Sequence, residues 1–400
     1  MSDSVAAWLI LPLGIALGWY IRGRGAEGAG SGFGATGPSG MGDDRPTAEA
    51  MAGISNLVVD DPDQALAALL RVGEFDSQAI ELHLTLGALF RKRGEVDRAL
   101  RVHEALVERA QLRPDQADRA RYELALDYLK AGMIDRAEQL FEALSQRGLH
   151  VTSALESLVS IHEQSHEWRR AIDASRRLQA VAALPRQAIT AQYYCELADE
   201  ARRAKNSEEA LRLARRALDE DGGCVRANLL IGALLEAAGD RVGAIKALRR
   251  VPEQDLRYIP EIVEPLLRCS EAEHQLPEFL EFLQELDAED TVSVSVLAQA
   301  RLLKETGTNP ARFLAESFAA NPRWALLEQL LQAIEPPQDE SMALAMNTLR
   351  EALRIAAASR TRYRCTSCGL APGLLFWHCP SCKTWGSVVP ADDRLTPVKI

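Results

Sequence analysis

Hydrophobic residues recur through the middle of the chain at helical spacing, in blocks that predict pairs of amphipathic helices. An alanine holds the same place in five successive blocks, at separations of 38, 34, 39 and 34 residues. These residues are Ala99, Ala137, Ala171, Ala210 and Ala244. Thirteen residues before each alanine stands an aliphatic residue, in turn Leu86, Leu124, Leu158, Leu197 and Ile231. Because alanine lets two helices approach closely, we predict that each block is a helical hairpin.

The turns between the predicted helices support this interpretation. Three blocks carry a glycine there, at Gly94, Gly132 and Gly239. The segments LTLGALFRKRGEVDRALRVHEAL, YELALDYLKAGMIDRAEQLFEAL and LLIGALLEAAGDRVGAIKALRRV resemble tetratricopeptide repeats. The sequence therefore predicts an all-α fold, a tetratricopeptide-repeat superhelix over residues 47–358, with the helices of about 323–358 as its cap. Such a stack presents a long concave surface that suits a peptide or protein partner.

The N-terminal residues are typical of a membrane anchor. The segment 5–21 holds 17 residues without a charge, about the minimum for a helix that spans a bilayer. Asp3 precedes it and Arg22 and Arg24 follow it, so the positive-inside rule leaves the rest of the chain in the cytoplasm. We predict a transmembrane helix at residues 1–22. A cleaved signal peptide is the alternative, although no basic segment precedes the apolar run.

Composition adds two constraints. Glycine, serine and proline dominate residues 23–46, which predicts a flexible linker between the anchor and the array. The formal net charge of -11 argues against broad nucleic-acid binding, because a phosphate partner calls for a basic face. Three of the seven cysteines, Cys195, Cys224 and Cys269, are dispersed in helical patterns, where we expect them to be small buried apolar residues.

The other four cysteines predict a metal site near the C-terminus. Cys365, Cys368, Cys379 and Cys382 form two C-x-x-C pairs separated by ten residues. Four thiolates can supply a closed tetrahedral shell for one Zn or Fe ion, which leaves no open position for catalysis. We assign residues 359–390 to a rubredoxin-like metal-binding domain and 391–400 to a tail. About thirty residues are too few for an independent core, so the metal must contribute to folding.

Three roles for this domain follow from its residues. The first is structural, with the aromatic residues forming a small core packed against the last repeat helices. The second is electron transfer, since the arrangement resembles a shortened rubredoxin carrying iron. The third is nucleic-acid binding, because residues 360–400 carry six Lys or Arg against two Asp. The closed shell favours the structural or docking role. We expect His378, beside Cys379, to pack or to form hydrogen bonds rather than to bind the metal.

One motif suggests an enzyme. Residues His162 to His166 read HEQSH, which satisfies the H-E-x-x-H pattern of zinc metalloproteases. That site needs both histidines on one face of a continuous helix. In the repeat alignment His162 falls where other blocks place a packed apolar residue, and His166 falls where Gly94, Gly132 and Gly239 make the turn. We therefore predict no protease site and no catalytic residue.

The order of anchor, repeat array and terminal YRCTSCG…WHCPSC knuckle, together with the GWYIRGR exit from the apolar segment, resembles the lipopolysaccharide assembly protein B family. The resemblance covers essentially the whole chain. The glycine-rich linker departs from what we expect of the family and affects only the tether length.

The resemblance implies a single-pass adaptor of the inner membrane, with most of the chain on the cytoplasmic side. It implies that the protein regulates lipopolysaccharide synthesis by promoting degradation of the lipid A pathway deacetylase by the membrane protease FtsH, and links synthesis to lipopolysaccharide transport proteins. The four cysteines carry over as metal ligands, and no catalytic residue does. An electron-transfer protein on a repeat scaffold is the alternative function, and a homodimer stays open at this point.

Overall fold

A computed structural model describes residues 77–108, 112–146, 148, 150–286, 292–305, 307–335, 337–358 and 361–391. The predicted anchor at 1–22, the linker at 23–46 and residues 392–400 of the predicted tail lie outside these ranges. Within the described ranges no helix combines the length and apolar character that a membrane span requires.

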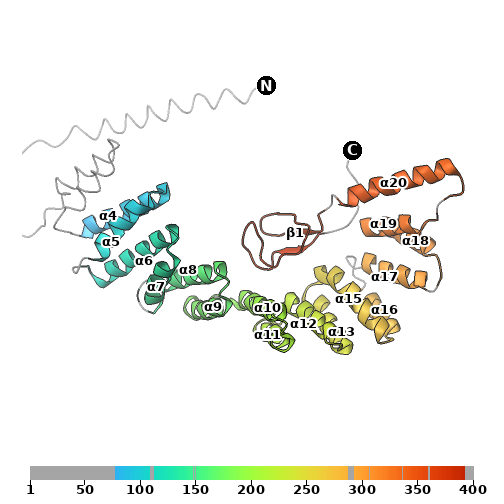
Figure 1. Cartoon of the computed structure of the whole chain (residues 1–400), viewed down its shortest axis with the longest axis horizontal. Helices are drawn as coiled ribbons and strands as arrows, with labels where there is room; N and C mark the ends of the chain where they lie inside the picture. The colour runs from blue at the N-terminus through green and yellow to red at the C-terminus, as the bar shows by residue number, and fades with distance from the viewer. Residues whose placement is uncertain are drawn as a thin grey trace, which may run out of the picture.

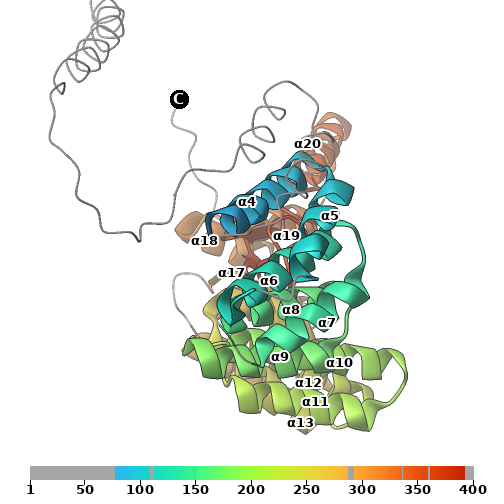
Figure 2. The same cartoon turned by 90° about the vertical axis from the view of Figure 1, so that its left-hand side faces the viewer.

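Antiparallel helix pairs follow one another through most of the described chain. The five pairs are α4 (Ser77–Arg93) with α5 (Val96–Val107), α6 (Pro114–Lys130) with α7 (Ile134–Ser145), α8 (Val151–Gln164) with α9 (Trp168–Ala182), α10 (Gln187–Arg203) with α11 (Ser207–Glu220), and α12 (Val225–Ala237) with α13 (Arg241–Leu248). After them come α14 (Val251–Gln254), η1 (Leu256–Tyr258), α15 (Ile259–Ala272), α16 (Leu276–Glu285), α17 (Val292–Glu305), α18 (Ala311–Ala320), α19 (Trp324–Ala333) and α20 (Glu340–Ala358). The helices stack into a curved array (Figure 1), and an end-on view shows one pair lying on the next (Figure 2).

The contact residues predicted from the spacing are buried as expected. The five alanines that hold the same place in successive pairs are 0% exposed, and the aliphatic residues thirteen positions earlier are all buried. The same spacing continues into α15 and α16. Leu266 takes the place of the aliphatic residue and Phe279 that of the alanine, and both are fully buried. Phenylalanine stands here in place of the repeated alanine, so the residue that marks the earlier pairs in the sequence is missing from this pair.

The turns within the pairs share one backbone conformation. Gly94, Gly132 and Gly239 have positive φ values of 83°, 76° and 85°. His166 occupies the equivalent turn at φ 57°, which confirms its predicted place outside the helix. A positive φ in a non-glycine residue is uncommon, so glycine is the more usual residue at this turn.

The C-terminal part is a small β-ribbon, residues 363–390, called the ribbon below. Strand β1 (Tyr363–Cys365) pairs antiparallel with β2 (Val388–Pro390), so that Tyr363 faces Pro390 and Cys365 faces Val388. The ribbon lies within the bend of the helical array, beside helices that precede it by more than a hundred residues (Figure 1). The all-α class therefore holds for the array, and the metal-binding domain adds the two short strands.

Candidate metal centre

The four predicted ligands come together at one end of the ribbon. The Sγ atoms of Cys365 and Cys382 are 3.7 Å apart, those of Cys368 and Cys379 are 3.8 Å apart, and all four lie within 4.8 Å of one another. A tetrahedron of sulfur at about 2.3 Å from a zinc ion has edges of about 3.8 Å. A disulfide would need about 2.05 Å, and all four cysteines are free. The sulfur atoms therefore fit one tetrahedral metal ion.

Two matching turns place the sulfur atoms. Gly369 donates its backbone N–H to the carbonyl of Cys365 at 3.0 Å, and Lys383 donates likewise to Cys379 at 3.0 Å. Both turn residues have positive φ, 78° for Gly369 and 59° for Lys383. A glycine marks the first turn in the sequence, whereas Lys383 follows the second pair without one. Each C-x-x-C pair thus folds back on itself and directs both sulfur atoms to one point.

Hydroxyl groups beside the sulfur atoms favour thiolates. The Thr384 hydroxyl lies 3.3 Å from Cys382 Sγ and lowers the pKa of that thiol to about 5. Ser387, whose Oγ is 3.3 Å from Cys365 Sγ, lowers the pKa of Cys365 in the same way. Metal ligation requires the deprotonated form, so these neighbours favour the ligand form of Cys365 and Cys382.

An aromatic residue of the ribbon anchors it to the third helix pair. Trp385 donates its indole N–H to the Glu163 carboxylate at 2.8 Å, and the Tyr193 hydroxyl donates to the same oxygen at 2.5 Å. The Trp385 ring packs edge-on against Trp168 and Tyr193, with centroids 6.1 and 5.7 Å apart. His378 stacks on the Trp385 ring with centroids 4.3 Å apart. Its Nε2 lies 2.8 Å from the carbonyl oxygen of Lys383, so it has the packing and hydrogen-bonding role we predicted.

A second set of contacts holds the ribbon against η1 and α12. Trp377 stacks on Tyr258 with centroids 5.5 Å apart, and the Tyr258 hydroxyl donates to the carbonyl of Val388 at 3.1 Å. Burial is the main cause that raises the pKa of Tyr258 to about 12. The Arg226 guanidinium lies over the Trp377 ring at 5.9 Å, a distance at which cation and ring attract. It also forms ion pairs with two acidic residues of α10, Glu196 at 2.9 Å and Asp199 at 2.8 Å.

A third contact joins β1 to α15, where the Tyr363 hydroxyl donates to Glu261 at 2.8 Å. Together these contacts correct one prediction. We expected the ribbon aromatics to pack on the last repeat helices, but Trp385 contacts α8, α9 and α10, and Trp377 contacts α12 and η1. Phe376 is 37% exposed and is not part of a closed core. Sequence position is a poor guide here because the array curves and brings its middle, rather than its end, to the ribbon.

The H-E-x-x-H segment has a different use from the one its pattern suggests. Glu163 accepts the bonds from Trp385 and Tyr193, and His166 lies in the turn after α8. His162 is buried, and its Nδ1 lies 3.2 Å from the Glu167 carboxylate. Burial lowers the pKa of His162, against the opposing effect of Glu167. The two histidines therefore do not form the paired ligands of a metalloprotease.

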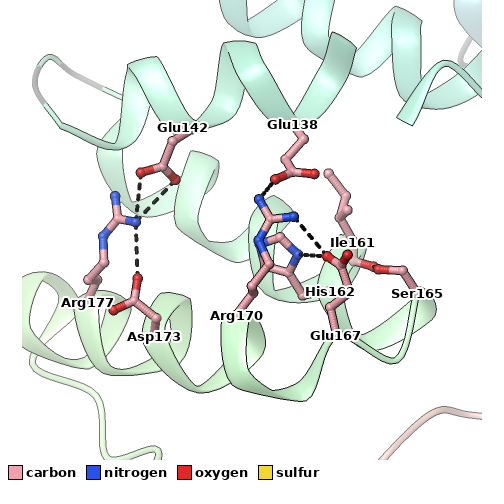
Figure 3. Close-up of polar contacts among 9 residues, drawn as sticks. All are labelled: Glu138, Glu142, Ile161, His162, Ser165, Glu167, Arg170, Asp173 and Arg177. Atoms are coloured by element: carbon pink, nitrogen blue, oxygen red, sulfur yellow. Dashed lines mark hydrogen bonds and ion pairs between the residues drawn. The ribbon is translucent and has the colours of Figure 1, made fainter. Parts of the chain in front are cut away.

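An ion-pair cluster lies beside this segment. Ligand atoms of Glu138, His162 and Glu167 lie within 4.8 Å of one another. Figure 3 shows the Arg170 guanidinium between the two carboxylates, paired with Glu138 and, at 3.0 Å, with Glu167. A neighbouring arginine, Arg177, similarly binds Glu142 at 3.0 Å. An arginine thus occupies the place that a metal ion would take, and the cluster joins α7, α8 and α9.

The fold and site define a class of protein: a helical-repeat scaffold that carries a four-cysteine metal ribbon within its bend. Residues 363–390 match a family model described as a rubredoxin metal binding domain. The chain is similar to lipopolysaccharide assembly protein B of Escherichia coli (strain K12), with 31% identity over 96% of this chain and 97% of that protein. The protein of the same name from Haemophilus influenzae is 30% identical over 97% of this chain and 98% of its own length. This chain belongs to the lipopolysaccharide assembly protein B family.

Among solved structures, one of the MamA protein is similar to part of the array. It covers 45% of this chain and 93% of its own, at 21% identity and a TM-score of 0.29.

Proposed function

We propose that this chain is an inner-membrane adaptor that promotes FtsH-dependent degradation of the lipid A pathway deacetylase and links lipopolysaccharide synthesis to its transport. The observation that carries the proposal is the relationship to lipopolysaccharide assembly protein B over 96% of the chain. The predicted anchor at residues 1–22 confines the array to the membrane, with most of the chain on the cytoplasmic side. An adaptor then acts by raising the concentration of substrate near the protease.

The site supports a non-catalytic role for the ribbon. Cys365, Cys368, Cys379 and Cys382 would hold one Zn or Fe ion, which would supply folding energy through a closed shell of four thiolates. The ribbon in turn presents Trp377, Trp385 and Tyr363 to the array. These contacts tie the ribbon to helices from α8 to α15, which suits a scaffold that holds a partner.

The test is the half-life of the deacetylase in cells with and without this protein, with FtsH present in both. We expect the deacetylase to accumulate and its half-life to lengthen when the protein is absent. A second strain should carry Cys379→Ser, which removes one ligand, and it should behave like the deletion. An unchanged half-life in the deletion strain would overturn the proposal.

Electron transfer is a second candidate, favoured by one observation. Cys368 is exposed, whereas Cys365 and Cys379 are buried, so one ligand residue of the cluster lies at the surface, where an electron-transfer partner could approach it. The ion would then be iron, and the purified protein would show a thiolate-to-iron absorption band that bleaches on reduction and returns on oxidation. Absence of iron from protein isolated at its natural level would exclude this function.

A further inference from the structure

Two of the three cysteines outside the ribbon lie in contact with each other. Cys195, Cys224 and Cys269 are dispersed along the chain, and all three are buried as predicted. The array brings Cys195 of α10 beside Cys224, the residue before α12, so that their Sγ atoms are 3.8 Å apart. Both thiols are free, and a disulfide needs a separation of about 2.05 Å. Each sulfur therefore has to move by about 0.9 Å, which is the size of ordinary thermal displacement in a folded protein.

The surroundings of Cys224 favour its thiolate. Cys224 stands at the N-terminal end of α12, where backbone N–H groups attract negative charge. The carboxamide of Gln192 donates to its Sγ at 3.7 Å. The hydrogen bond from Cys195 is the main cause that lowers the pKa of Cys224, and the backbone N–H of Ala227 adds to it, against the opposing effect of burial. Burial raises the pKa of Cys195, so the pair combines one nucleophilic sulfur with one protonated thiol.

A hollow lies beside Cys224. Gly222 and Gly223, directly before it, are exposed and line a cavity of about 560 Å³. Leu218 also lines this cavity, and it packs on the small apolar cluster that contains both cysteines. Cys224 is 2% exposed and Cys195 is 0% exposed, so only a small oxidant can reach the sulfur atoms. Hydrogen peroxide, which has two heavy atoms, meets this condition.

We infer that Cys195 and Cys224 are a modification site, where hydrogen peroxide forms a reversible disulfide bond between them. The Cys224 thiolate attacks one peroxide oxygen, the O–O bond breaks, and hydroxide leaves, which makes a sulfenic acid at Cys224. The Cys195 sulfur then attacks the Cys224 sulfur, so that the S–S bond forms as the S–O bond breaks. The proton of Cys195 leaves with the hydroxyl group as water, and the proton that Cys224 gave up joins the hydroxide. Two thiols and one peroxide thus yield one disulfide and two waters, and a dithiol reverses the bond by exchange.

The bond would lie next to a residue that holds the ribbon. Arg226, two residues after Cys224, lies over the Trp377 ring. Its guanidinium pairs at 2.9 Å with Glu196, the residue after Cys195. The disulfide and this ion pair are therefore neighbouring links between α10 and α12. Because the bond joins residues 29 positions apart, it restricts the unfolded chain, and the oxidised protein should unfold at a temperature several degrees above that of the reduced protein.

The test uses the full-length protein in detergent with its metal bound. The protein is reduced, freed of reductant and exposed to hydrogen peroxide at a dose that leaves the metal in place, and its remaining thiols are then alkylated. Trypsin releases Cys195 in the peptide 187–202 and Cys224 in the peptide 217–226. We expect mass spectrometry to find these two peptides joined, at a mass two hydrogens below the sum of the free thiol forms. Dithiothreitol should separate them.

Three variants test the order of the steps. Cys195→Ser keeps the attacking sulfur, so peroxide should leave Cys224 as a sulfenic acid, which dimedone traps. Cys224→Ser should leave Cys195 as an unmodified thiol at the same dose, because that thiol stays protonated. The matched control is Cys269→Ser, which removes a buried cysteine outside the pair and should form the bond as the wild type does.

The wild-type peptides decide the inference even where a variant does not fold. Two separate alkylated peptides after peroxide treatment would overturn it, because the pair would then be only a buried contact. A disulfide from Cys195 or Cys224 to any other cysteine would also overturn it. Trapping of a sulfenic acid at Cys195 in the folded Cys224→Ser variant would contradict the assignment of Cys224 as the attacking thiolate.

Discussion

The indole N–H of Trp385 lies 2.8 Å from the carboxylate of Glu163, although 222 residues separate them in the chain. This bond closes the bend of the array onto the ribbon. Glu163 also accepts the hydroxyl of Tyr193, whose ring is fully buried. Burial is the main cause that raises the pKa of Tyr193 well above its ordinary value, and the Glu163 charge adds to it. One carboxylate thus satisfies two donors from different parts of the fold.

Replacement of Glu163 by alanine should loosen this joint. The variant leaves the Tyr193 hydroxyl without its acceptor in a buried site, which costs about 1–3 kcal/mol of folding free energy. Glu163→Gln keeps a carbonyl acceptor and should lose less. Urea unfolding followed by circular dichroism measures both, and Glu156→Ala, an exposed residue of the same helix, is the control. Equal stability of Glu163→Ala and the control would show that the bond contributes nothing.

Metal removal should release the ribbon while leaving the helices intact. Structural zinc contributes about 10–16 kcal/mol in small four-ligand domains, more than a ribbon of this size can replace by packing. Trp377 and Trp385, which pack on the array, should become solvated when a chelator removes the ion. We expect a red shift of tryptophan emission together with an unchanged helical signal at 222 nm. Emission that stays unchanged after complete metal loss would mean that packing alone holds the ribbon.

The sequence predicted the parts of this structure that depend on local spacing. The five repeated alanines, the turn at His166 and the four ligands could all be predicted, because each follows from a repeat period or a ligand motif. The surface of the array that the ribbon contacts could not be predicted from the sequence. Glu163 and Tyr193 occupy ordinary helical positions, and their role depends on the curvature of the array, which sums small rotations between successive pairs. A single sequence contains no pattern that shows which two distant residues will be in contact.

Glycine at position 166 should give a more stable turn after α8 than alanine at the same position. His166 has φ 57°, a conformation that costs a non-glycine residue about 1 kcal/mol. Its ring also contacts Trp168 at 5.1 Å, so loss of the side chain has a cost of its own. His166→Ala loses the ring and keeps the strained backbone, whereas His166→Gly loses both. We expect the glycine variant to exceed the alanine variant by up to about 1 kcal/mol in urea unfolding, and both should leave deacetylase turnover unchanged. Loss of turnover in both would revive a role for the H-E-x-x-H segment.

Alkaline pH should weaken the contact between Tyr258 and the ribbon. Burial is the largest cause that raises the pKa of Tyr258 to about 12, and the charge of Asp255 adds to it. Glu261 and Cys224 raise this pKa further, while Arg257 lowers it. The folded state therefore favours the neutral phenol. This contribution is complete below the unfolded pKa of about 10 and disappears as the pH rises to about 12, at a loss of about 2–3 kcal/mol.

The variant Tyr258→Phe isolates this effect. Phenylalanine cannot ionise, but it also loses the hydrogen bond to Val388, which costs about 1 kcal/mol at neutral pH. The variant should therefore be less stable than the wild type at pH 8, and the difference should shrink or reverse between pH 10 and 12. Urea unfolding across this range measures the difference, and tyrosinate absorbance near 295 nm reports the ionisation. A constant difference from pH 8 to 12 would mean that Tyr258 ionises without opposing the folded state, and that its hydroxyl is not held between η1 and β2 in solution.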